Sequence, residues 1–143
     1  VAVFAEGVGA MKAATQGTIE YARARKQFGQ PIGQFQVLQH RMVDMMGEGE
    51  HATSITYMAN MKINLSVEER RMAVSAAKSY IGKAGRFVGQ HAVHIHGGMG
   101  VTEELNIGHY FKRLTTINIQ FGDEDHHLKR FSALANDESR AAA

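Results

Sequence analysis

One short stretch gathers most of the polar recognition chemistry in this sequence. It reads Arg-Lys-Gln-Phe-Gly-Gln-Pro-Ile-Gly-Gln-Phe-Gln over residues 25–36, and it holds the only proline of the chain. A guanidinium, amide side chains and an aromatic ring on one connection are more than a simple turn between helices requires. The stretch is therefore a candidate recognition site.

A second candidate is the glycine run Gly97-Gly98-Met99-Gly100. Glycine lets another molecule approach the backbone closely, and bare N–H groups favour anions. The run does not match a Rossmann or P-loop motif, because no strand precedes it and no Lys-Ser/Thr pair follows it. A tight turn between helices explains the same residues and is favoured by the pattern alone.

Histidines and carboxylates offer two weaker candidates. His91 and His94 share a helix face and suggest a metal pair, but no acidic residue stands at a matching spacing, so no metal is expected. The acids at 103–104 and 123–125 suggest a paired-carboxylate site. Both groups lie where helix N-termini favour acids, so a capping role is the preferred interpretation.

Composition narrows the class of protein. The chain has 143 residues, of which 44% are hydrophobic and 21% charged, which predicts one globular domain. It has no cysteine, which excludes disulfides and thiolate chemistry and agrees with a reducing, cytoplasmic location. A net charge of +2 argues against nucleic acid, and no apolar run is long enough to span a membrane. The N-terminal residues resemble the middle of a helix rather than a signal peptide, so we expect a fragment of a longer protein.

Hydrophobic periodicity predicts an all-α fold. Apolar and small residues recur every three or four positions over 1–27 and 34–63. Ser66 and Glu69 form a capping box that opens a third helix of about thirty residues. Shorter helices are expected after Thr102 and after Asp123, with residues 115–120 as an extended connection and no sheet anywhere. The expected architecture is a single domain over 1–143, an antiparallel up-and-down four-helix bundle with an additional short helix.

Two of these stretches together resemble the acyl-CoA dehydrogenase family. The first runs over residues 21–32 with Phe35-Gln36 after it, and the second over residues 96–104 with Phe111-Lys112-Arg113 after it. Their separation and the helix lengths between them also match. The resemblance covers essentially the whole chain and corresponds to the family's C-terminal helical-bundle domain, without the N-terminal helical and middle β domains.

The resemblance implies an FAD flavoprotein of fatty acid metabolism that oxidises acyl-CoA to trans-2-enoyl-CoA. In the family, a carboxylate removes the α-proton and the β-hydrogen leaves as hydride to flavin N5. The resemblance also implies electron transfer to an electron-transfer flavoprotein. Family members are homo-oligomers, dimers or tetramers, in which the ADP half of the cofactor lies across a subunit interface.

Cofactor contacts follow from the same resemblance. A guanidinium suits a pyrophosphate, so Arg25 would pair with that group of FAD, and glycine would admit it closely. The glycine motif would come from a neighbouring subunit. The implied cofactor-binding positions are Arg25, Gln27, Phe28, His94, Gly97, Gly98, Asp123 and Asp125.

One departure from the family concerns the catalytic base. Many members carry a glutamate in a Tyr-Glu-Gly-Thr stretch, which corresponds here to Gln120-Phe121-Gly122-Asp123. The glutamate position is Phe121, and phenylalanine cannot accept a proton. Some relatives place the base on the first helix of this domain, just upstream of Val1 here, and others are inactive partners in mixed oligomers. The sequence therefore assigns neither the base nor the acyl chain specificity.

Three hypotheses remain open at this point. The chain is the FAD-binding and oligomerisation domain of an active dehydrogenase, a non-catalytic assembly subunit, or a cofactor-free helical interaction module. An acid just upstream of Val1 would favour the first, and its absence the second. We expect the isolated chain to lack dehydrogenase activity and to self-associate, because its apolar stripes exceed what one bundle can cover.

Overall fold

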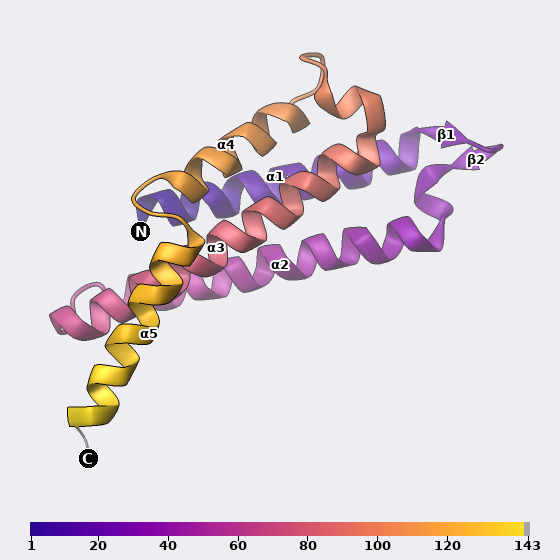
Figure 1. Ribbon diagram of the computed structural model, residues 1–143. Helices are drawn as coiled ribbons and strands as arrows, with labels where there is room; N and C mark the ends of the chain where they lie inside the picture. The colour runs from indigo at the N-terminus through magenta and orange to yellow at the C-terminus, as the bar shows by residue number, and fades with distance from the viewer. Residues whose placement is uncertain (142–143) are drawn as a thin grey trace.

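The computed structural model describes residues 1–141, with side chains as far as Asp137. Figure 1 shows three long helices side by side, a fourth lying along the first and third, and a fifth that leaves the bundle from the end of the fourth. The helices are α1 (Ala2–Ala24), α2 (Gln36–Met61), α3 (Val67–His96), α4 (Ile107–Ile119) and α5 (Glu124–Ala141). The predicted all-α fold is confirmed, but the additional helix α5 has 18 residues and is longer than α4, which has 13.

Helix α3 is the centre of the bundle and packs against all four other helices. Its start is fixed as the sequence predicts, because the Ser66 hydroxyl accepts the Glu69 N–H while the Glu69 carboxylate accepts the Ser66 N–H. Three glycines on one face, Gly82, Gly85 and Gly89, leave room for α4: a Cβ on Gly89 would stand 2.8 Å from the Phe111 ring. Small residues therefore bring α3 and α4 into close contact.

The core consists of one apolar cluster shared by the first four helices. Completely buried members include Met11, Met45 and Ile81, and burial of such side chains stabilises a fold by about 1.5–3 kcal/mol each. Met46 and Met61, by contrast, are 52% and 80% exposed. The methionines of α2 thus fill the core on one side of the helix only.

A small β-hairpin corrects the prediction that the chain has no sheet. Two-residue strands β1 (Lys26–Gln27) and β2 (Gln30–Pro31) pair antiparallel between α1 and α2. Phe28 and Gly29 at the turn have φ of 55° and 82°, as a type I′ hairpin turn requires. Helix α1 therefore ends at Ala24 rather than at residue 27, and Gly29 shapes the hairpin turn rather than ending the helix.

Helix α4 overturns a second prediction, that residues 115–120 are extended. The helix runs to Ile119, because Ile117 is buried against the core and tertiary packing outweighs the strand preference of β-branched residues. The hydroxyls of Thr115 and Thr116 donate to the carbonyls four residues earlier, at 2.9 and 3.0 Å, which satisfies them within the helix.

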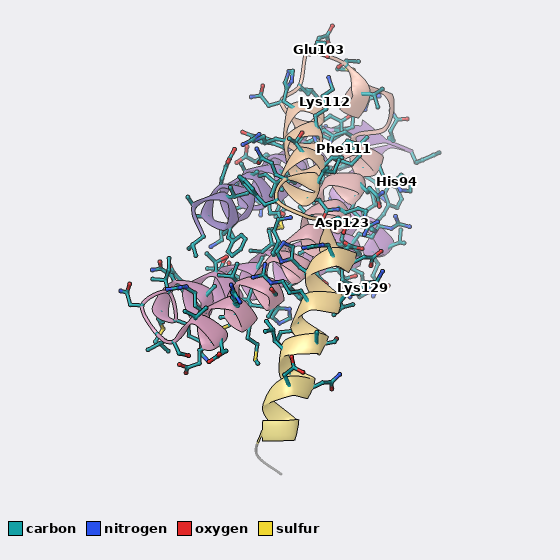
Figure 2. All side chains as sticks on the ribbon, turned by 60° about the vertical axis from the view of Figure 1, so that its left-hand side comes forward. His94, Glu103, Phe111, Lys112, Asp123 and Lys129 are labelled. Carbon is teal, nitrogen blue, oxygen red and sulfur yellow. The ribbon has the colours of Figure 1, made fainter. Side chains whose placement is uncertain are left out.

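The approach to α4 also differs from expectation. Residues Gly97–Val101 form the 3-10 helix η2, and α4 begins at Ile107 rather than near Thr102. Glu103 does not cap this helix. Its carboxylate pairs with Lys112 at 3.0 Å, and both residues are labelled in Figure 2. The same carboxylate lies 3.3 Å from His109. Across residues 1–141, no helix combines the length and hydropathy needed to cross a bilayer.

Candidate cofactor-binding end of the bundle

The β1–β2 hairpin projects a free guanidinium and an aromatic ring from one end of the bundle. Arg25 is extended, exposed, and its guanidinium makes no ion pair or hydrogen bond with the residues described. Phe28 is 91% exposed, and its ring meets Phe35 edge-on at 6.0 Å. The Ile32 N–H donates to the Arg25 carbonyl at 2.8 Å, and the buried Ile32 side chain anchors the hairpin to the core. The hairpin is therefore rigid at its base and open at its tip.

The glycine turn at the end of α3 leaves its backbone uncovered. Gly97 has φ of 61°, and both Gly97 and Gly98 are exposed. A Cβ built on either residue would meet nothing within 4 Å, so the free space lies directly above the main chain. This turn can admit another molecule against its N–H groups, as the glycine run suggests.

Contacts between α1 and α3 place the hairpin and the glycine turn at the same end of the bundle (Figure 1). The Tyr21 ring stacks on the His96 imidazole at 4.2 Å, and the Tyr21 hydroxyl donates to the His96 carbonyl at 3.4 Å. Tyr21 lies one turn before Arg25, and His96 directly precedes Gly97. The two sequence motifs are thus joined through one ring pair, in which His96 is buried and Tyr21 is half-buried.

His94 lies on the outer face of the same end and contacts α2. Its Nδ1 faces the Arg41 guanidinium at 3.2 Å. Because a guanidinium only donates, this nitrogen is the acceptor and the proton lies on Nε2. His91, the other member of the suggested metal pair, is hydrogen-bonded through Nδ1 to the Phe87 carbonyl. In the part of the chain that the structure describes, no three His or acidic residues gather to hold a metal.

Asp123 lies in the turn from α4 to α5 and Asp125 in the first turn of α5, away from the glycine turn. Helix α3 rises about 1.5 Å per residue, so the stretch from Lys78, which contacts the α4–α5 turn, to His94 is about 24 Å long. Asp123 caps α5, because its Oδ1 accepts the His126 N–H at 2.8 Å, and this bond lowers the pKa of the carboxyl group. The eight predicted positions thus form two groups on one chain rather than one cluster.

The turn itself is held by two buried residues that the sequence reasoning missed. Lys78 Nζ donates to the carbonyls of Asn118 and Gly122 at 2.8 and 2.7 Å, and His127 Nε2 contacts the Phe121 carbonyl at 2.9 Å. Both side chains are buried. No spacing in the sequence signals these bonds, although a lysine within an otherwise small and apolar helix face was a visible anomaly.

A hollow of about 260 Å³ lies beside the Phe121 ring, between the start of α1 and α3. Its walls are mostly apolar, and the buried ammonium and imidazole of the turn form one side. The lining residues are Val1, Ala2, Val3, Phe4, Val74, Lys78, Phe121 and His127. Phe121 therefore occupies the edge of an apolar hollow.

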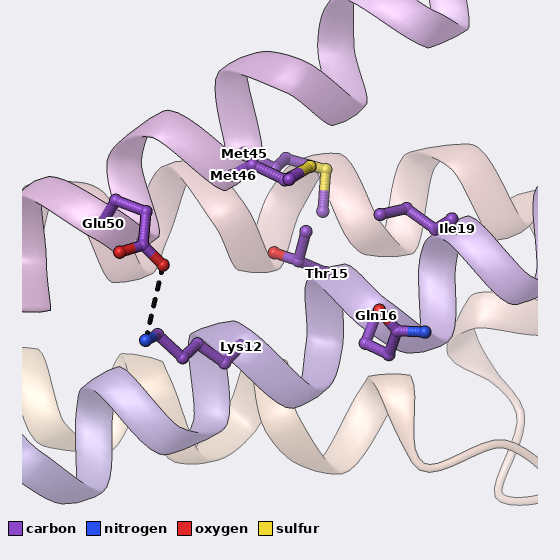
Figure 3. A pocket seen from close by; sticks show the side chains of 8 residues that line it. Lys12, Thr15, Gln16, Ile19, Met45, Met46 and Glu50 are labelled. Atoms are coloured by element: carbon purple, nitrogen blue, oxygen red, sulfur yellow. Dashed lines mark ion pairs between the residues drawn. The ribbon is translucent and has the colours of Figure 1, made fainter.

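A second hollow, of about 280 Å³, lies between α1 and α2 (Figure 3). An ion pair of 3.4 Å between Lys12 and Glu50 borders it, and Met45 and Met46 form its upper wall. The Thr15 hydroxyl is buried and has no hydrogen-bond partner among the described residues. These lining groups are more typical of a surface that contacts another protein than of a reaction site.

Two buried histidines predict how stability depends on pH. Burial lowers the pKa of His96 and of His127 below the ordinary value of 6.5. As pH falls below about 6.5 the unfolded chain binds these protons before the folded one does, so the free energy of unfolding decreases. We expect thermal unfolding to shift to lower temperature as pH falls through this range. The His127→Gln variant should flatten the profile, whereas replacing exposed His126 by Gln should leave it steep.

Comparison with known proteins identifies the family. Residues 1–133 match the family profile described as "Acyl-CoA dehydrogenase, C-terminal domain". The chain therefore belongs to the acyl-CoA dehydrogenase family, and its helical bundle is that C-terminal domain.

Individual relatives agree with this assignment. The chain is 36% identical over 110 residues to acyl-CoA dehydrogenase IpdE2 of Mycobacterium tuberculosis, an alignment that covers 76% of this chain and 32% of the relative. A variant of the Tcur3481-Tcur3483 steroid ACAD superposes with a TM-score of 0.93 at 28% identity, over 97% of this chain and 38% of that one. The FAD complex of PigA superposes with a TM-score of 0.84 at 26% identity, over 93% and 34%. This chain thus spans about a third of the length of its relatives.

Proposed function

We propose that this chain is the C-terminal FAD-binding and assembly domain of a longer acyl-CoA dehydrogenase. The observation that carries the proposal is the open end of the bundle, where the free Arg25 guanidinium and the uncovered Gly97–Gly98 backbone sit on elements fixed by the Tyr21–His96 stack. The fold of this end is shared with the FAD complex of PigA. When bound, FAD supplies the electron acceptor for oxidation of an acyl-CoA to its trans-2-enoyl product.

The residues of the open end suit a dinucleotide pyrophosphate. Arg25 offers a planar fork of donors without a competing carboxylate among the described residues, and Gly98 leaves room for close approach to main-chain N–H groups. Gln27 and Phe28 flank the guanidinium on the hairpin, and His94 borders the glycine turn. The second group, Asp123 and Asp125, would contact a different part of an extended cofactor or a cofactor bound by another copy.

The catalytic base is proposed to lie outside this chain, just upstream of Val1. Phe121 carries no titratable group, and the Asp123 carboxylate accepts a backbone hydrogen bond as the α5 cap. The apolar hollow beside Phe121 suits the acyl portion of the substrate, and it includes the first residues of α1. A base preceding Val1 would enter this region on the same helix.

A second candidate function is a non-catalytic subunit of a mixed oligomer. It is favoured by Phe121, which stands where many relatives carry the glutamate. Under this alternative the bundle binds cofactor or stabilises assembly without abstracting a proton. The residue types immediately before Val1 distinguish the two candidates, because only an active subunit needs a carboxylate there.

We also propose that the domain self-associates through α2. Val43, Met46 and Tyr57 on its outer face are 63%, 52% and 66% exposed, and spacings of three and eleven residues place them on one side of the helix. Met46 also lines the hollow that contains the unpartnered Thr15 hydroxyl, which a side chain from a second copy would fill. Further parts of the proposal are a cytoplasmic location and electron transfer to an electron-transfer flavoprotein.

The proposal is tested on the longer protein that contains this chain. We expect it to purify with the yellow absorbance band of FAD and as a dimer or tetramer by light scattering, and acyl-CoA should bleach the flavin band anaerobically. A protein that binds flavin but is not bleached by any acyl-CoA would favour the non-catalytic subunit. A protein without flavin would remove the FAD-binding proposal and leave an assembly subunit or a cofactor-free module.

A further inference from the structure

The turn between α4 and α5 holds a large side chain in a strained backbone conformation. Phe121 has φ of 61°, a left-handed value that costs a residue with a side chain about 1–2 kcal/mol. The Phe121 ring is 77% exposed, so burial of the ring does not offset this strain. Contacts to the neighbouring backbone must therefore hold the conformation.

Lys78 provides the contacts on both sides of Phe121. Its Nζ donates to the carbonyl of Asn118 before the strained residue, at 2.8 Å, and to the carbonyl of Gly122 after it, at 2.7 Å. The Asn118 carbonyl lies in the last turn of α4, where helix carbonyls lack intrahelical partners. One ammonium group thus ties the end of the helix to the exit of the turn.

The opposite side of the turn is fixed from α5 and α3. His127 Nε2 donates to the Phe121 carbonyl at 2.9 Å, because a carbonyl can only accept. Arg86 of α3 forms an ion pair with Glu124 in the first turn of α5. Donors from two helices therefore surround the turn while its aromatic ring stays outside the core.

A buried ammonium is a costly way to fill space. Lys78 is 2% exposed, and desolvation of an ion costs several kcal/mol unless its partners compensate. An apolar side chain of similar length would fill the same volume without this penalty. The charge at this position is explained by the two carbonyls that it holds.

We propose that Lys78 is a positioning residue, which fixes the α4–α5 turn in its left-handed form and so holds the side chain at position 121 at the edge of the apolar hollow beside α1. That this hollow receives substrate rests on the proposed function, whereas the hold of Lys78 on the turn does not. The lysine acts on the turn through backbone carbonyls only. Its effect should therefore be felt at whichever side chain occupies position 121.

The chain contains no tryptophan, so Phe121→Trp places a single indole reporter on the turn. Fluorescence anisotropy decay and acrylamide quenching then measure how freely this indole moves and how exposed it is. Adding Lys78→Met removes both donors, and hydrogen bonds to a charged group contribute about 1.5–3 kcal/mol. We expect the population of the released turn to rise by about tenfold or more, seen as fast local motion of the indole.

Two further variants, each made together with Phe121→Trp, separate an effect on the turn from a general loss of stability. Lys78→Gln retains a neutral amide donor group on a shorter side chain and should give an intermediate indole mobility. This variant also serves if Lys78→Met does not fold. Ile81→Ala, one turn further along α3, removes a buried side chain that makes none of the hydrogen bonds of the turn. It should lower thermal stability and leave the mobility of the indole unchanged well below its unfolding temperature.

An indole that stays equally immobile in folded Lys78→Met and Lys78→Gln variants would overturn the proposal. The same holds if Ile81→Ala releases the indole as much as Lys78→Gln, because general loosening would then explain both. The measurement needs neither flavin nor acyl-CoA. Absence of flavin from the longer protein would thus refute the proposed function without touching this result.

Discussion

Replacing Arg25 by Ala is expected to weaken FAD binding by about 10- to 100-fold in the flavoprotein that contains this chain. Hydrogen bonds from a charged donor contribute about 1.5–3 kcal/mol, and 1.4 kcal/mol corresponds to tenfold in affinity. The guanidinium makes no ion pair with the described residues. Its removal therefore deprives no buried group of its partner. The loss should therefore appear in cofactor affinity and not in folding. Titration of the apoprotein with FAD measures it, and thermal unfolding of the apoprotein serves as the stability check.

Two variants sharpen this experiment. Arg23→Ala removes an exposed guanidinium from the last turn of α1, two residues away, and should leave FAD affinity unchanged. Arg25→Lys keeps the charge but not the planar fork, so we expect partial loss. Equal affinity of wild type and Arg25→Ala would contradict the proposed contact.

Gly100→Ala is expected to destabilise the domain by about 1–3 kcal/mol, the usual effect of forcing an extra carbon into a packed site. A Cβ on Gly100 would stand 2.6 Å from the Val93 carbonyl oxygen and 3.0 Å from the His96 Cβ. The first of these is a main-chain atom of α3, which cannot move aside as a flexible side chain could. Thermal unfolding followed by circular dichroism should show the loss directly.

Gly98→Ala is the matched control for this change. A Cβ there meets nothing within 4 Å, and the residue does not need a left-handed conformation, so stability should be unchanged or slightly higher. FAD affinity should fall instead, because the added methyl group occupies the space through which the cofactor is proposed to reach the backbone. If Gly98→Ala binds FAD as wild type does, the glycine turn is only a connection between helices.

Local signals explain what could be predicted from the sequence. The capping box at Ser66 and Glu69 lies within four residues and appears in the structure as expected. The three long helices follow from periodic apolar positions, which remain visible in any single window of sequence. The start of α5 after Asp123 was predicted because acids favour helix N-termini. In the structure the Asp123 carboxylate accepts the His126 N–H.

Long-range packing explains what could not. Residues 115–120 look like a strand by composition, and only burial of Ile117 against the other helices makes them helical. The partners of Lys78 lie 40 and 44 residues away, so no local pattern can reveal them. The hairpin was missed because Phe28 adopts positive φ, a conformation that phenylalanine rarely takes.

The candidate site was also predictable only in part. Residue types in the two motifs indicated recognition chemistry, and the structure brings the hairpin and the glycine turn to one end. Asp123 and Asp125 lie apart from them at the start of α5, which the order of residues in the sequence does not show. Assignment of all eight positions to cofactor binding stays a prediction until the variants are measured.

Helix α3 sets a fixed distance between the glycine turn and the α4–α5 turn. Its continuous run from Val67 to His96 places His94 sixteen residues after Lys78. Inserting a single residue between them would turn one group by about 100° relative to the other and move it by about 1.5 Å. Changes in length are therefore tolerable in the connection around Asn64, where the chain is exposed, but not along α3.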